Sequence, residues 1–144
     1  MGTFSATIEA KVLDEIFGGF AYTPTTSLYV GLSDSTITSS GFEYVGNEPS
    51  TDTGYARVHI DNTTSTNWTD AETSADVGVK FNTVAITFPV VACSSWQNVS
   101  YAFIVTASCS TGELICWGAL TTDKDLAVGD TASFAAGAFK ITLD

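Results

Sequence analysis

The amino-acid sequence predicts an all-β fold, an antiparallel β-sandwich or jelly roll with one short N-terminal helix. Short runs rich in Val, Ile, Tyr, Phe and Thr recur along the chain, and turn-forming Gly, Ser, Asn and Asp separate them. Residues 101–121 read as strand, turn and returning strand, which is typical of a hairpin. Helical periodicity is confined to residues 5–17. Together these patterns predict roughly seven to nine strands packed in two layers.

The length and composition favour one domain over residues 1–144. The chain has 144 residues, of which 44% are hydrophobic and 12% aromatic, enough to build a core. Within this domain we place the helix at 5–17 and the β-sandwich at 27–144. We find no internal repeat and no interdomain linker.

The helix prediction rests on an apolar stripe. Its members recur every three or four positions: Phe4, Ile8, Val12, Leu13, Ile16 and Phe17. Ser5 is a favourable N-cap, and Gly18-Gly19 supplies a stop. We expect the helix to pack on its own domain. The alternative is an arm that docks on a neighbouring subunit.

The strand candidates are residues 27–32, 55–60, 77–81, 84–88, 101–106, 113–121, 131–136 and 138–143. The polar segment 33–54 is long for a plain loop, and long loops are often functional. Phe42 and Tyr44 lie within it and predict a short strand or an apolar anchor. Trp96 and Trp117 lie beside strand runs, so we expect them in the core.

The charge balance excludes several partners. Sixteen acidic residues face five Lys and Arg, for a net charge of −11, and the cations are scattered singly. Nucleic acid and anionic membranes need clustered cations, so we expect neither as a partner. The first residues resemble no secretory signal, and no run is apolar enough for a transmembrane helix. Copies of the chain that associate must overcome mutual repulsion through apolar contacts.

The chain contains no recognisable catalytic set, so we expect no enzyme, no metal and no cofactor. His59 is the single histidine, and the three cysteines fit no zinc pattern. We expect the cysteines to be small buried apolar residues; a Cys109–Cys116 disulfide across the hairpin is the alternative. The carboxylates in 61–76 are interpreted as solvated loop acids, because they lack EF-hand spacing.

Two aromatic residues are candidates for stacking on sugars. Trp68 and Tyr44 both lie in polar stretches, so we expect their rings to be exposed. An exposed aromatic ring has an apolar face on which a sugar can lie. This pattern is the basis of a glycan-binding alternative.

An ordered series of short motifs carries a family resemblance. The motifs occupy residues 28–32, 54–57, 86–89, 96–104, 118–122, 128–131, 134–137 and 141–144. The series resembles a family of small virion proteins of tailed bacteriophages, often labelled tail-fibre-like. This resemblance implies a β-sandwich, assembled in the host cytoplasm and located in the virion. It implies no catalysis.

Our leading hypothesis is a capsid decoration (cement) protein that binds the outer surface of the major capsid protein shell and stabilises it. Several weak contacts, made by a homo-oligomer such as a trimer, would act together through high effective concentration. The candidate subunit contacts are Phe4, Ile8, Val12, Phe42 and Tyr44. The alternative is a tail or tail-fibre component that binds a host glycan through Trp68 and Tyr44.

Overall fold

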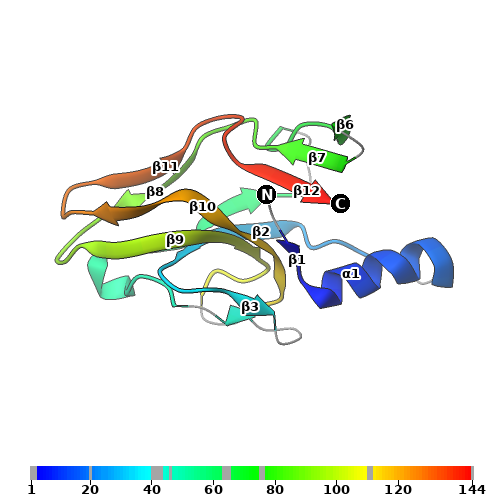
Figure 1. Cartoon of the computed structure of the whole chain (residues 1–144), viewed down its shortest axis with the longest axis horizontal. Helices are drawn as coiled ribbons and strands as arrows, with labels where there is room; N and C mark the ends of the chain where they lie inside the picture. The colour runs from blue at the N-terminus through cyan, green and yellow to red at the C-terminus, as the bar shows by residue number, and fades with distance from the viewer. Residues whose placement is uncertain are drawn as a thin grey trace.

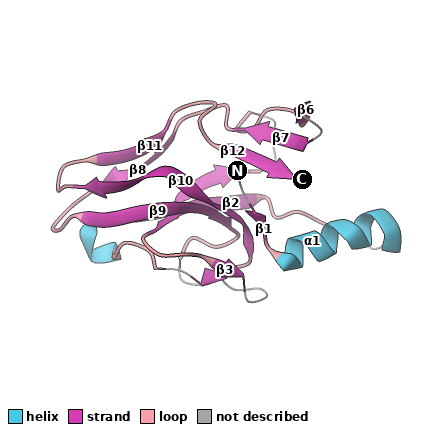
Figure 2. Cartoon of the chain, viewed as in Figure 1, coloured by secondary structure: helices cyan, strands magenta, loops and turns pink. Residues whose placement is uncertain are grey.

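The computed structural model describes residues 3–19, 21–39, 44–45, 47–62, 66–74, 77–109 and 112–143. It has the predicted fold class, a set of antiparallel strands with one short N-terminal helix (Figure 1, Figure 2). The main sheet has the order β1-β10-β9-β2-β5. Its strands are β1 (Thr3–Phe4), β2 (Ser27–Ser33), β5 (Val58–Asp61), β9 (Trp96–Val105) and β10 (Leu114–Leu126).

The second layer consists of two smaller sheets. One pairs β8 (Ile86–Val90) with β11 (Thr131–Phe134), and the other has the order β12 (Lys140–Leu143), β7 (Val77–Phe81) and β6 (Glu72–Ser74). Figure 1 shows β8 and β11 lying along the same side of β9 and β10. A short hairpin of β3 (Thr38–Ser39) and β4 (Tyr44–Val45) and a 3-10 turn (Thr51–Thr53) complete the elements.

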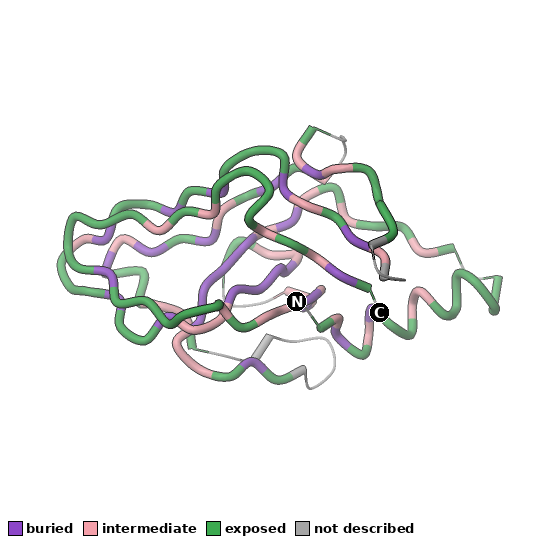
Figure 3. Tube along the Cα trace, turned by 45° about the horizontal axis from the view of Figure 1, so that its top comes forward, coloured by how far each residue is buried: buried purple, intermediate pink, exposed green. Residues whose placement is uncertain are grey.

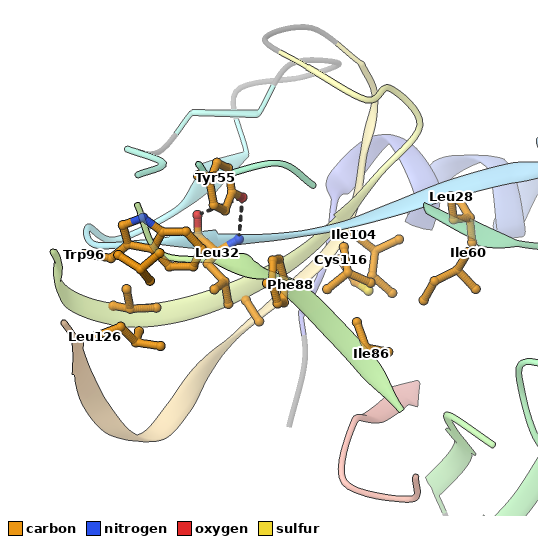
Figure 4. Packing of buried hydrophobic residues seen from close by; sticks show 14 of the residues in the cluster. Leu28, Leu32, Tyr55, Ile60, Ile86, Phe88, Trp96, Ile104, Cys116 and Leu126 are labelled. Atoms are coloured by element: carbon orange, nitrogen blue, oxygen red, sulfur yellow. Dashed lines mark hydrogen bonds between the residues drawn. The ribbon is translucent and has the colours of Figure 1, made fainter. Parts of the chain in front are cut away.

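Alternation along β2 and β9 divides the buried side chains between two clusters. Leu28, Val30 and Leu32 of β2 all enter the main core between the layers (Figure 4). In β9, Ile104 joins them, while its neighbour Phe103 enters a smaller cluster on the opposite face of the sheet. Successive side chains of a strand point to opposite faces, so this period of two is expected. Figure 3 shows how buried stretches concentrate in the central strands.

Most predicted strands are confirmed, including the hairpin, in which β9 pairs with β10. The strand predicted at 55–60 begins only at Val58. Tyr55 and Arg57 instead direct their side chains to Glu48: the Tyr55 hydroxyl donates to its carboxylate at 2.7 Å and the Arg57 Nε at 3.0 Å. The backbone ladder with β2 therefore begins only at Val58, while the side chains of Tyr55 and Arg57 make hydrogen bonds in the interior.

The cysteine prediction is correct for Cys116 and wrong for the other two. Cys116 of β10 lies in the main core, whereas Cys93 and Cys109 are exposed in turns, and all three are free. Turn residues pack against few neighbours, so their side chains are not enclosed. Burial raises the pKa of the Cys116 thiol to about 12, and a protonated thiol is a poor nucleophile.

We therefore expect DTNB to label two thiols rapidly in the native protein at pH 8. Cys93 and Cys109 should react, and Cys116 should react only after denaturant unfolds the chain. Mass spectrometry of the labelled peptides identifies the sites. Equal labelling rates for all three thiols in the native protein would contradict the burial of Cys116.

Candidate docking interface

The N-terminal helix is fixed to the domain at its beginning. It comprises α1 (Ala6–Leu13) and a wider π-helical turn, η1 (Asp14–Gly18), which continues it to the predicted glycine stop. The Ser5 hydroxyl caps the helix by accepting from the Ile8 amide at 3.3 Å, and the Ser5 amide donates to the Ile115 carbonyl at 2.9 Å. The first turn is thus joined to β10, so its position is well defined.

A second link joins the middle of α1 to the hairpin. The Lys11 ammonium lies 2.6 Å from the Glu113 carboxylate, and the ring of Tyr22 lies 5.4 Å from the same ammonium. The amide of Tyr22 also donates to the carboxylate of Glu15. The chain that leaves the helix therefore returns along the side that carries Lys11 and Glu15.

The end of the helix exposes three large apolar side chains. Leu13 is 56% exposed, Ile16 64% and Phe17 82%. We call these three residues the apolar tip. Figure 1 shows the helix extending beyond the β-sandwich, and Figure 3 shows little burial along its distal half. A scattered exposed apolar residue is ordinary, but three within five residues form a patch of the kind found at interaction sites.

The tip faces away from the chain that packs on the helix. Leu13 and Phe17 are four residues apart and share one face, as do Lys11 and Glu15. Positions two apart, such as Lys11 and Leu13, lie about 200° apart around a helix with 3.6 residues per turn. Because Lys11 and Glu15 contact their own chain, Leu13 and Phe17 point away from it, and all three side chains of the tip are exposed.

The surroundings of the tip are acidic. Asp14 and Glu15 belong to the same turn, which carries no basic residue, and Lys11 is already paired with Glu113. The carbonyl end of a helix dipole adds partial negative charge at this point. The tip is therefore an apolar surface in a negative field.

The structure places the predicted subunit contacts at different depths, and their role as contacts stays a prediction. Ile8 is buried by its own domain and Phe4 packs against the main core, so neither presents the expected free surface. Val12 is half-buried. Phe42 lies outside the described residues, as does the side chain of Tyr44, whose backbone forms β4. The exposed large apolar side chains of this helix, Leu13, Ile16 and Phe17, follow directly after Val12.

The predicted exposure of Trp68 is wrong. Its side chain is 5% exposed, its backbone bridges to Asn82, and its ring packs edge-on against Phe139 with centroids 6.4 Å apart. A sugar cannot stack on a ring that the chain itself encloses. No local pattern indicates this burial, because Phe139 is far along the chain from Trp68.

A second surface feature is a groove of about 600 Å³ between β10 and β11. Leu120 and Phe134 contribute apolar surface, and Lys124, Asp125 and Asp130 are its charged lining residues. Both carboxylates are engaged: Asp125 accepts from the Asn98 amide and Asp130 from the Ala127 amide, each at 2.8 Å. With one lysine and two aspartates, the charged lining residues of this groove sum to −1.

The described residues contain neither a cluster of metal-ligating side chains nor a helix that could cross a membrane. No three His, Cys, Asp or Glu side chains in that part of the chain are grouped so that they could hold a metal ion. No helix there is long and apolar enough to span a bilayer.

Comparison with protein families shows to which family the chain belongs. The family model described as Podophage GP4 fiber I protein gp80 matches residues 3–142. The chain belongs to this family. A search of curated proteins found no match. The predicted resemblance to phage virion proteins is confirmed, and membership in a fibre family makes this a structural protein of the virion.

Proposed function

We propose that the protein is a non-enzymatic subunit of a tail fibre and that the apolar tip joins it to the rest of the fibre. The tip carries this proposal, because a subunit that acts alone gains nothing from exposing Leu13, Ile16 and Phe17. Burying each such side chain fully stabilises a contact by about 1.5–3 kcal/mol. The β-sandwich is then a rigid body held by its N-terminal helix. The fibre family supports this role.

The family description favours the tail-fibre hypothesis over the decoration hypothesis. Binding to the major capsid protein and assembly as a trimer stay predictions from the sequence. Because Trp68 is buried, it no longer supports glycan binding by this chain.

Deletion of the gene tests the proposal. We expect particles with intact heads whose tails lack fibre density in electron micrographs and whose adsorption to host cells is reduced. A wild-type copy supplied from a plasmid should restore both. Normal tails on bare, fragile heads would contradict the proposal and favour decoration of the shell.

A further inference from the structure

We infer that the apolar tip inserts into an apolar pocket of a different virion protein and that Lys or Arg side chains rim this pocket. The inference rests on the proposed function, since it names the kind of partner that the tip binds. It draws on three properties of the helix: how firmly it is held, what it exposes and what charge surrounds it.

The helix that carries the tip is already ordered before it binds a partner. The Ser5 cap, the bond from the Ser5 amide to Ile115 and the Lys11–Glu113 ion pair hold the helix at its beginning and middle. Gly19, with φ 70°, ends it, and its amide donates to the Asp14 carbonyl. A binding element that is already ordered loses little conformational entropy on docking. Phe17, the most exposed of the three, is the natural anchor for a pocket, because aromatic side chains are enriched at interface cores.

The charge around the tip selects a cationic partner. Asp14 and Glu15 flank the apolar side chains, the helix dipole adds negative charge, and Lys11 is engaged within the chain. Complementary potentials steer association and suppress wrong partners. Lys or Arg side chains at the rim of the pocket would therefore match the acidic residues beside the tip.

The same charges disfavour a second copy of this chain as the partner. Each copy carries a net charge of −11, so two copies repel each other. The groove between β10 and β11 has one lysine, Lys124, and two acids, Asp125 and Asp130, among its lining residues. A smaller cavity of about 160 Å³ has a single charged lining residue, Lys140. Neither cavity provides the set of cations around its rim that the tip needs.

Incorporation of variants into particles tests the inference. We expect Phe17→Asp, supplied from a plasmid to the deletion phage, to lower the amount of protein in purified particles at least about tenfold, which corresponds to 1.4 kcal/mol. The matched control is Val128→Asp, which changes an apolar residue of 58% exposure in the turn before β11. Val128→Asp should be incorporated like wild type. Equal incorporation of both variants would overturn the inference.

Binding of purified protein to gene-deleted particles tests the charge argument. We expect wild-type binding to weaken as NaCl rises, because salt screens exposed charges. The charge reversal Glu15→Lys should weaken binding at low salt. Binding that is insensitive to salt, or that Glu15→Lys strengthens, would overturn the cationic rim.

Sedimentation of the free protein distinguishes a different partner from a second copy. We expect wild type and Phe17→Asp both to sediment as monomers, with matching circular dichroism spectra, since the Phe17 ring is mostly exposed. A wild-type oligomer that Phe17→Asp dissociates would overturn the inference. The proposed function is tested separately from this inference. It fails if deletion of the gene alters the head of the particle and not the tail.

Discussion

Replacing Arg57 by methionine is expected to lower the free energy of unfolding by about 3–5 kcal/mol, because removing one partner of a buried ion pair leaves the other uncompensated. The Arg57 side chain is 1% exposed and that of Glu48 is 18% exposed, and the guanidinium donates to the Glu48 carboxylate at 2.5–3.2 Å. It also donates to the carbonyl of Ala107 at 2.8 Å. Chemical denaturation of the purified variant measures the loss.

The loss of stability should be large because Glu48 also accepts a hydrogen bond from Tyr55. The Tyr55 hydroxyl donates to Glu48 and accepts from the Leu32 amide at 2.9 Å, a link drawn in Figure 4. Burial, and then the charge of Glu48, raise the pKa of this hydroxyl above its usual value, so it stays protonated and can donate. Without Arg57, the carboxylate faces Tyr55 in a poorly solvated site.

The matched control is Lys11→Met, which breaks a more exposed ion pair. The side chains of Lys11 and Glu113 are 34% and 18% exposed, so solvent screens this pair. We expect a loss below about 1 kcal/mol. Equal losses of stability for Arg57→Met and Lys11→Met would contradict the argument that burial makes the Arg57–Glu48 pair more important for stability than the Lys11–Glu113 pair.

Replacing Gly31 by alanine is also expected to lower the free energy of unfolding by a large amount. Gly31 of β2 pairs with Phe103 of β9, and a Cβ at position 31 would lie 2.1 Å from the ring Cζ of Phe103. The ring is fully buried and the Arg57 guanidinium carbon lies 5.4 Å from its centroid, so it has little room to move. Overpacking of this kind costs about 1–3 kcal/mol, and we expect the upper end of this range in thermal or denaturant unfolding.

The control for this variant is Gly78→Ala in β7. A Cβ there would make ordinary contacts, 3.7 Å from the Leu143 carbonyl oxygen and 4.0 Å from its Cβ. We expect stability within about 0.5 kcal/mol of wild type. A Gly31→Ala protein as stable as Gly78→Ala would contradict the close packing of β2 on Phe103.

The sequence predicted the elements whose signals are local. The N-cap at Ser5, the stop at Gly19 and the hairpin of β9 and β10 each depend on residues close together in the chain. Trp68 and Tyr55 depend on distant partners, Phe139 and Leu32, which no local pattern reveals. The polar residues around Trp68 therefore predicted an exposed ring. The alternation around Tyr55 predicted a longer strand than the structure has.

The proposed docking surface lies one turn beyond the helix residues that the sequence predicted as subunit contacts. Periodicity identified the apolar stripe of the N-terminal helix, and docking on a neighbouring subunit was one of its two interpretations. Periodicity does not show where the supporting domain ends. Ile8 lies over the domain and is buried, whereas Phe17 extends beyond it and is exposed. Only the three-dimensional structure separates the two halves of the stripe.

The most direct test of the account is a cryo-electron-microscopy map of the intact particle. We expect density for this chain in a tail fibre, with Leu13, Ile16 and Phe17 enclosed by a chain of different sequence and Lys or Arg near Asp14 and Glu15. Density on the capsid shell, or a tip that faces solvent in the assembled particle, would contradict it.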